Sequence, residues 1–427
     1  MRRCERARRL AGLLFLSYIL AGCNRAGDPE HLITFWGIGR EGEVVQRLLP
    51  RFEALHPGIK VTVEQLPLTA AHEKLLTAFA GDVLPDICQL GNTWLPEFAA
   101  LGALTPLGSQ VASSPTVRQA DYFPGIWDTN VIAGTLYGVP WYVDTRLLFY
   151  RRDLLRQAGF EAPPKSWDEW AHMLAAIKQR VGPDRYAVLL PLNEFEPLLV
   201  LAMQQPEPLL RDEARYGNFR GAGFRRALSF YVDIFRHGWA PPLNATQISN
   251  VWNDFGRGYH SFYVSGPWNI GEFKRRLPPQ LQSTWMTAPM PGPQGPGASL
   301  AGGSSLVIFR RSPHQQDAWL LLQYLSSPEV QRQFYQLTGD LPPRRESWRD
   351  PRLAVDPYIR AFREQLERVK ATPKVPEWER IVNEMQHVAE RTVHGDLTVA
   401  EAGEELDRTV DGILEKRRWL MQHGSEP

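Results

Sequence analysis

Apolar and polar positions follow two different periods along the first hundred residues, and segments with one period alternate with segments of the other. Short runs rich in β-branched and aromatic residues are typical of strands, whereas apolar residues at every third or fourth position are typical of amphipathic helices. Strand-like runs span 32–37, 59–66 and 85–90, and helical segments span 43–58, 72–81 and 92–104. This order predicts a parallel sheet covered by helices. Pro50 lies inside the first helical segment, and we expect it to kink that helix.

The alternation continues over the rest of the chain. Further strands are predicted at 147–150, 186–192, 257–266 and 304–309, and further helices at 166–182, 224–238 and 317–337, before a mostly helical tail at 356–422. The helix at 166–182 has the clearest ends: Ser166 is placed to cap its start, Glu169 stands at capping-box distance, and Gly182 follows it. Two α/β units interleaved with late returning segments fit this order better than two domains in succession.

The first 22 residues have the layout of a secretory signal peptide. A basic stretch at 1–9 precedes an apolar stretch at 10–20, which is too short to span a bilayer, and two small residues precede Cys23. The quartet Leu-Ala-Gly-Cys at 20–23 resembles the bacterial lipobox, in which the cysteine becomes the first mature residue and carries lipid. We therefore expect a lipoprotein-type signal peptide at 1–22, a lipidated Cys23 and a linker at 23–30. Cleavage nearby by an ordinary signal peptidase is the alternative.

Charge and cysteine content narrow the class of protein. Loss of residues 1–22 removes five arginines and one glutamate, which changes the formal charge of the chain from +1 to −3. This balance gives no reason to expect nucleic acid as a partner. Of the three cysteines, Cys4 leaves with the signal peptide, Cys23 is modified, and Cys88 lies in an apolar segment where a small buried residue is expected. The mature chain then has no disulfide, and its stability must come from its core.

Common catalytic and metal-binding patterns do not occur in the sequence. His72 and Glu73 are not followed by a second histidine at zinc-protease spacing, and neither a GxSxG elbow nor a GxxxxGK phosphate loop is present. The ten histidines are scattered without the spacing of metal ligands. We therefore predict no catalytic residues, no metal and no cofactor.

The segment YGVPWYVDTRLLFY at 137–150 brings candidate binding groups to the edge of a predicted strand. Trp141, Asp144 and Arg146 precede the buried run that ends at Tyr150. These three residues are either ordinary rim residues of the strand or groups that face a shared ligand. The residues alone leave both possibilities open.

An ordered set of segments resembles the family 1 extracellular solute-binding proteins of bacterial ABC importers, the maltose-binding-protein-like family. The matching segments are ITFWG, FEALHPGIKVTV, PDICQLGNTW, YGVPWYVDTRLLFYRRDLL, VSGPW, AGGSSLVIF, WLLLQYLSSPEVQ and TGDLPP, in family order over nearly all of the mature chain. The resemblance implies an α/β fold of type II, with two Rossmann-like lobes joined by hinge strands around a cleft. It implies crossings near 141–145, 302–304 and 339–344. The N-terminal lobe would hold 31–141 and 304–341, and the C-terminal lobe 142–303 and 342–427.

A sugar cleft needs aromatic groups against the C–H faces of the sugar and polar groups at its hydroxyl rim. The resemblance implies that Trp268, in the GPW motif, stacks on sugar and that Asp144 accepts hydroxyl hydrogen bonds. The alternatives are a core aromatic for Trp268 and an ion pair with Arg146 for Asp144. Residues at predicted strand ends or hinge segments add Trp36, Asn92, Thr93, Trp94, Trp141, Asn269, Gly303, Ser304 and Arg344 to the candidate set, with Gly302 beside them. The resemblance also implies that Arg40 and Glu194 occupy places that can touch sugar.

The function implied by the resemblance is non-covalent capture of a neutral sugar or oligosaccharide and its delivery to the membrane permease of an ABC importer. We expect a monomer, held by lipid on Cys23 in the periplasm or at the cell surface. One departure concerns Arg151, which stands where the family often has Asn; we expect Arg151 and Arg152 to lie on the surface.

Two other classes of function compete with the carrier. An exported glycoside hydrolase would also have a Trp-lined cleft, and it would need two carboxylates flanking the scissile bond. Asp144 and Glu194 are the pair that could be imagined for it, although no motif places a second acid beside Asp144. A peptide or anion carrier would want several basic groups at one site, and only Arg40 and Arg146 are candidates. The sequence does not name the sugar.

Overall fold

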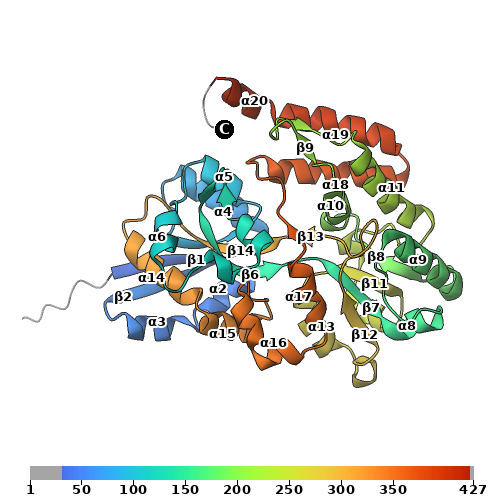
Figure 1. Ribbon diagram of the computed structural model, residues 1–427, viewed down its shortest axis with the longest axis horizontal. Helices are drawn as coiled ribbons and strands as arrows, with labels where there is room; N and C mark the ends of the chain where they lie inside the picture. The colour runs from blue at the N-terminus through green and yellow to red at the C-terminus, as the bar shows by residue number, and fades with distance from the viewer. Residues whose placement is uncertain (1–30, 424–427) are drawn as a thin grey trace, which may run out of the picture.

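The structure is a computed structural model that describes residues 31–423, and its strands form two main sheets (Figure 1). The first sheet has the order β2-β1-β3-β14-β6, and the second has the order β12-β7-β11-β8. The strands of the first sheet are β1 (His31–Ile38), β2 (Ile59–Leu66), β3 (Ile87–Gly91), β6 (Gly138–Asp144) and β14 (Gly302–Ile308). Those of the second are β7 (Leu147–Arg151), β8 (Tyr186–Leu189), β11 (His260–Ser265) and β12 (Trp285–Ala288). The predicted two-lobed α/β fold is confirmed.

Strand direction differs in part from the prediction of a parallel sheet. β1 runs parallel to β2 and β3, as the strand–helix alternation predicts, but β14 runs antiparallel to both β3 and β6. In the second sheet β8 and β11 are parallel, and β7 is antiparallel to β11 and β12. The reversed strands β14 and β7 each directly follow a crossing between the sheets, so their direction is set by the crossing of the chain and not by a local strand–helix repeat.

Helices cover both sheets. The helices associated with the first sheet are α2 (Gly39–Val45), α3 (Leu49–Leu55), α4 (Ala71–Ala80), α5 (Leu95–Ala100), α6 (Gly108–Ser113), α7 (Pro124–Asp128), α14 (Gln315–Leu325) and α15 (Pro328–Thr338). The single kinked helix predicted over 43–58 is two helices, α2 and α3, joined by a turn. Pro50 occupies the first turn of α3, where its missing N–H costs no hydrogen bond, so the chain restarts a helix there and does not bend one.

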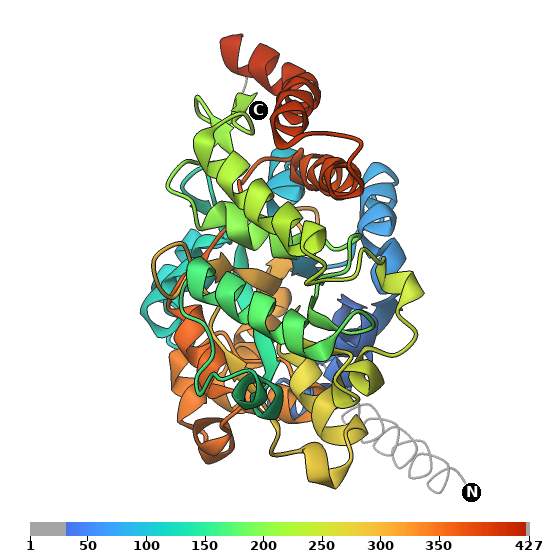
Figure 2. The same ribbon diagram turned by 90° about the vertical axis from the view of Figure 1, so that its right-hand side faces the viewer.

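The second lobe includes the helical tail, which is drawn in red in Figure 2. Its helices are α8 (Arg152–Gln157), α9 (Trp167–Val181), α10 (Glu196–Met203), α11 (Ala222–Arg236), α12 (Val251–Gly256), α13 (Trp268–Arg276), α16 (Pro351–Val355), α17 (Arg360–Leu366), α18 (Trp378–His394), α19 (Val399–Ile413) and α20 (Glu415–Gln422). Short strand pairs complete the fold: β4 (Val131–Ile132) with β5 (Thr135–Leu136), β9 (Leu210–Arg211) with β10 (Tyr216–Gly217), and β13 (Ser299–Leu300) with β15 (Val369–Lys370). At the start of α9 the Ser166 hydroxyl accepts from the Glu169 backbone N–H at 3.2 Å, which confirms the predicted cap.

Three chain crossings between the lobes lie side by side. The chain leaves the first sheet after Asp144, at the end of β6, and enters β7 three residues later, at Leu147. It returns between β13 and β14, where Gly303 pairs with Val143. The third crossing passes on the other side of β6, where the Val143 N–H donates to the Leu341 carbonyl at 2.9 Å. β6 therefore remains in the first sheet past residue 141, where the predicted lobe boundary falls.

Two buried residues test sequence predictions. Cys88 is a free, fully buried thiol in β3, as predicted. Arg151 is not on the surface, because only 5% of it is exposed. Its guanidinium donates to the Phe255 and Gly256 carbonyls at 2.7 and 2.9 Å and pairs with Asp153, so the end of α12 replaces water around it. Within residues 31–423 none of the helices combines the length and the apolar character that crossing a bilayer requires.

Candidate functional site

A cavity of about 610 Å³ lies between the two lobes, beside the crossings. The first lobe and β14 supply Glu41, Gln89, Asn92, Thr93, Trp94, Tyr142, Asp144, Gly303 and Ser304 to its lining. The second lobe and the third crossing supply Arg146, Phe195, Glu196, Trp268, Asp340 and Glu379. Seven predicted site residues therefore line one space: Asn92, Thr93, Trp94, Asp144, Trp268, Gly303 and Ser304.

Trp268 presents its indole to this cavity from the first residue of α13. The ring packs against Gly266, where a Cβ atom would lie 1.7 Å from the indole, so only glycine fits beneath it. The Arg146 guanidinium lies 4.8 Å from the ring centroid, within cation–π range. Trp268 nevertheless remains 41% exposed, which makes it an aromatic surface held in place at the wall of the cavity.

Asp144 and Arg146 form the charged centre of the site. The Arg146 Nη1 donates to both Asp144 carboxylate oxygens, at 2.7 and 2.8 Å, and its Nη2 pairs with Glu196. Burial raises the pKa of Asp144 above its ordinary value, and the adjacent Arg146 offsets this rise only in part. Asp144 therefore forms the ion pair and also lines the cavity. Its carboxylate oxygens have further lone pairs that can accept hydrogen bonds from a ligand.

Trp94 faces the cavity from the loop after β3. A Cβ on Gly91 would lie 3.3 Å from its indole, so the ring folds back over this glycine. His72 packs against the same ring with centroids 4.9 Å apart, and its Nε2 contacts Glu97 at 2.6 Å. The two tryptophans thus come from different lobes and share one cavity.

A buried polar network forms the floor of the site. The Gln89 amide oxygen accepts from the Ile38 N–H at 2.7 Å, and its nitrogen donates to the Tyr142 hydroxyl at 3.1 Å. The Ser304 hydroxyl also donates to the Tyr142 oxygen, at 3.0 Å. Gly303 beside it has a φ of +117°, and a Cβ there would lie 2.3 Å from the Tyr142 carbonyl. The close approach of β14 to β6 therefore requires glycine at this position.

Asp340 adds a carboxyl group from the third crossing. Only 8% of Asp340 is exposed, and its Oδ2 finds no hydrogen-bond donor among the described residues. Burial and the neighbouring Glu41 carboxylate raise the pKa of Asp340 well above its ordinary value. The site thus contains one acidic group that favours its protonated form.

Comparisons with known proteins decide which family this arrangement belongs to. Residues 37–332 match the family described as bacterial extracellular solute-binding protein. The chain belongs to this family. A solved structure of the sugar-binding protein MalE from Xanthomonas citri is 60% identical, covers 92% of this chain and 99% of its own, and superposes with a TM-score of 0.89.

Two curated relatives of this solute-binding protein are more distant. A maltotriose-binding protein of Pyrococcus abyssi is 22% identical over 84% of this chain and 77% of its own. An uncharacterized lipoprotein of Streptomyces antibioticus, encoded in the oleD 5′ region, is 27% identical over 82% of this chain and 79% of its own. The resemblance inferred from the ordered segments is therefore confirmed.

Three predicted contact residues of the solute-binding protein are packed away from the cavity. Trp36 lies in the first-lobe core with the Lys74 ammonium 5.1 Å from its ring centroid. Trp141 is 1% exposed and stacks on Phe334 with centroids 4.4 Å apart. Because side chains alternate along a strand, Trp141 points into the core while Tyr142 and Asp144 reach the cavity lining.

Asn269 is the third of these residues. It is buried, its amide nitrogen donates to the Ser265 hydroxyl at 2.6 Å, and its oxygen accepts from the Trp252 indole at 2.7 Å. Its side chain therefore holds the start of α13 against the end of β11. Asn269, the neighbour of Trp268 in the sequence, therefore supports that tryptophan.

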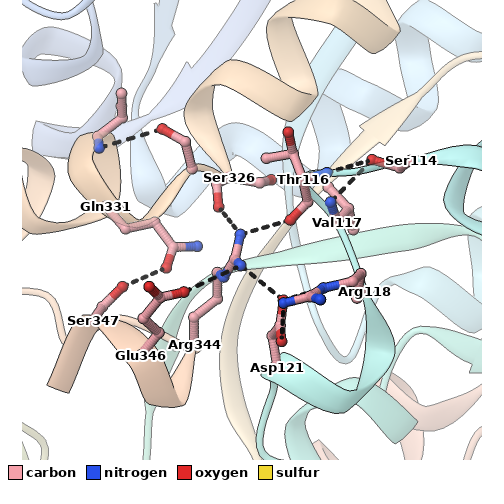
Figure 3. Close-up of polar contacts among 12 residues, drawn as sticks. Ser114, Thr116, Val117, Arg118, Asp121, Ser326, Gln331, Arg344, Glu346 and Ser347 are labelled. Carbon is pink, nitrogen blue, oxygen red and sulfur yellow. Dashed lines mark hydrogen bonds and ion pairs between the residues drawn. The ribbon is translucent and has the colours of Figure 1, made fainter. Parts of the chain in front are cut away.

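Arg344 is also structural. Figure 3 shows its guanidinium enclosed by backbone and side-chain acceptors of the first lobe. Its Nη1 donates to the Thr116 and Ser326 carbonyls at 2.8 and 3.0 Å, and its Nη2 pairs with Asp121 at 2.8 Å. All of these acceptors lie outside the cavity lining, so the prediction that Arg344 contacts the ligand is corrected.

Arg40 and Glu194 lie beside the cavity and not in its wall. Arg40 is exposed, donates to the Leu337 carbonyl at 2.9 Å, and lines a neighbouring groove along α13 and α15. Burial, with Glu196 nearby, raises the pKa of Glu194 to about 7.

Sequence reasoning missed several groups that do line the site, namely Glu41, Gln89, Tyr142, Glu196, Asp340 and Glu379. A polar Gln89 within the apolar run PDICQL was a usable signal, because a polar residue in a buried strand needs partners. The others come from a helix start, a crossing and the C-terminal tail, which only the folded chain brings together.

Proposed function

We propose that this solute-binding protein captures a neutral sugar or short oligosaccharide in its interlobe cavity, as a monomer, and delivers it to the permease of an ABC importer. The observation that carries the proposal is the shared cavity: Trp94 from one lobe and Trp268 from the other face a space that also exposes carboxylates and an amide. Aromatic faces and planar polar groups are what sugar recognition needs. The names of MalE from X. citri and of the P. abyssi relative point the same way.

The mechanism we propose is closure of the two lobes on the ligand. A ligand that contacts both lobes binds the closed form better and shifts the population toward it. Turning a mostly open protein into a mostly closed one takes about 5.5 kcal/mol of differential binding. The adjacent crossings at Asp144, Ala301 and Leu341 form the segment about which the lobes would rotate.

The competing proposal, a glycoside hydrolase, has less support. The Asp144 carboxylate is held by two hydrogen bonds from Arg146, and Glu194 does not line the cavity. The relatives reported above carry names of binding proteins and of a lipoprotein. Incubation of the purified protein with α- and β-linked disaccharides tests the alternative, and multiple-turnover release of monosaccharide would replace our proposal by it.

Replacing Trp268 by alanine should weaken sugar affinity at least about tenfold, because the indole supplies an aromatic contact worth about 1.5 kcal/mol or more. A thermal-shift screen over mono- and oligosaccharides finds the ligand, since a ligand bound only by the native state raises its apparent stability. Titration calorimetry with that ligand then compares Trp268→Ala with the parent.

The matched control is Trp419→Ala, because Trp419 is exposed on α20 and lies outside the cavity lining. Its affinity for the sugar should equal that of the parent. The free energy of unfolding of the empty Trp268→Ala protein should fall by no more than about 1 kcal/mol. A large loss of stability with unchanged affinity would assign Trp268 to the core and remove it from the site.

We also propose that lipid on Cys23 anchors the protein in the periplasm or at the cell surface. Cys23 and the predicted signal peptide lie outside the described residues, so support comes from the Leu-Ala-Gly-Cys quartet and from the lipoprotein relative in S. antibioticus. Cys23→Ser should move the protein from the membrane pellet to the soluble extracytoplasmic fraction. Unchanged membrane association of this variant would contradict anchoring through Cys23.

A further inference from the structure

Two histidines and one aspartate converge at the end of β1 that is remote from the cavity. His31 begins β1, and His314 and Asp317 lie at the start of α14. One ligand atom from each of the three side chains lies within 4.8 Å of the other two. The His31 Nδ1 contacts the Asp317 Oδ2 at 2.7 Å, and the two imidazole rings have centroids 5.8 Å apart. Ile38, at the opposite end of β1, lines the sugar cavity, so the two places are separate.

Partly buried hydrogen bonds to the buried Asp86 hold the backbone of this cluster in place. Asp86 accepts from the Thr34 N–H at 2.7 Å and from the Thr34 hydroxyl at 2.8 Å, which fixes it to β1. Its other oxygen accepts from the Ser312 hydroxyl at 2.6 Å, and the Ser312 oxygen accepts from the His314 N–H at 3.0 Å. One carboxylate thus ties β1 to the loop before α14, so the positions of His31 and His314 are set by the folded core.

We propose that His31, His314 and Asp317 form a binding site for a zinc ion. Neutral imidazole and carboxylate are zinc ligands, and three protein ligands with an open fourth position make a usual set. A tetrahedral ion about 2.1 Å from each ligand would space the ligand atoms roughly 3.4 Å apart. That spacing lies between the shortest contact of 2.7 Å and the 4.8 Å limit, so small side-chain rotations bring all three atoms to one ion.

The sequence could not indicate this site. His314 and Asp317 have the one-turn spacing of a chelating pair, but the third ligand is 283 positions away from His314. The prediction that the histidines lack metal-ligand spacing considered only neighbours along the chain. The proposed ion would clamp the start of β1 to α14, next to the segment that leads to Cys23.

Titration calorimetry with ZnCl2 on tag-free mature protein tests the site. We expect one zinc equivalent per chain, and we expect His31→Ala, His314→Ala and Asp317→Asn each to weaken that binding at least tenfold. Co²⁺ in place of zinc should give visible absorption bands of a tetrahedral site, and these bands should be lost in the triple variant. Mg²⁺ and Ca²⁺ should not compete, because they prefer sets of oxygen ligands.

The matched control is His237→Ala, an exposed histidine in the second lobe whose Nδ1 contacts the Asp233 carbonyl. It should bind zinc as the parent does. Zinc binding that survives in the triple variant, or the absence of a stoichiometric equivalent in the parent, would overturn the proposal. Sugar affinity should be the same with zinc and with a chelator, so the outcome is independent of the proposed transport function.

Discussion

Replacing Arg344 by leucine is expected to lower the free energy of unfolding by about 3–5 kcal/mol, the usual cost of removing one partner of a buried charged contact. Arg344 is 2% exposed, so bulk solvent has little access to its hydrogen bonds. The leucine would leave the Thr116 and Ser326 carbonyls without this donor and would take one of two arginines from Asp121. Urea unfolding followed by circular dichroism measures the effect.

The neighbouring position provides a matched control. Arg345 carries the same side chain, is partly exposed, and pairs with the exposed Glu367. Exposed pairs contribute about 1 kcal/mol or less, so Arg345→Leu should change the stability little. Sugar affinity of Arg344→Leu, measured at a temperature where it stays folded, should remain within about threefold of the parent, because the residue does not line the cavity. A stable Arg344→Leu protein that no longer binds sugar would restore the ligand role predicted from the sequence.

Much of the fold could be predicted because many of its strands and helices have clear local periods. The runs at β1, β2 and β3 match the structure closely, and Ser166 marked the start of α9 from its own side chain. The antiparallel direction of β14 could not be predicted in this way. It depends on a segment that returns to the first sheet from another lobe, and the local pattern does not record where a strand finds its partner.

The candidate site was predicted in part for a related reason. Asn92, Thr93 and Trp94 were chosen because ligands approach α/β sheets at strand ends, and all three line the cavity. Trp141 shows the limit of this rule: its position on the hinge strand was right, but the direction of its side chain follows the packing on Phe334. Asp340 was missed because a single acidic residue that follows a helix is usually a surface residue. Only the folded chain shows that the third crossing buries it.

The buried acid leads to the second prediction with a large expected effect. Replacing Asp340 by asparagine should stabilise the empty protein at pH 7.5, on the order of 1–3 kcal/mol, because an unsatisfied buried acceptor next to a second carboxylate is removed. Asparagine keeps the shape of the protonated acid and can donate to Glu41. Asp396→Asn, at an exposed position, controls for the change in net charge and should leave the stability nearly unchanged.

The pH dependence of this stabilisation identifies its cause. Burial and Glu41 raise the pKa of Asp340 in the folded state, so between its ordinary value near 4 and the raised value the folded state holds a proton that the unfolded state has lost. The stability contributed by Asp340 is therefore complete at low pH and decreases as pH rises through that window. Urea unfolding of the parent and of Asp340→Asn should give similar stabilities at pH 4 and the largest difference near neutral pH.

The difference in free energy of unfolding between the parent and Asp340→Asn separates the effect of Asp340 from the effects of other titrating groups. Burial and Arg151 lower the pKa of His260 to about 3, so this histidine makes both proteins less stable as pH falls below about 6.5, and its contribution cancels. Glu41, Asp144 and Tyr142 are the titratable groups that act on Asp340, and they are present in both proteins. Glu41→Gln should reduce the difference at neutral pH, because it removes the neighbouring negative charge. A difference that is constant from pH 4 to 8 would show that Asp340 is ionised in the folded protein, with a charged partner in place of a proton.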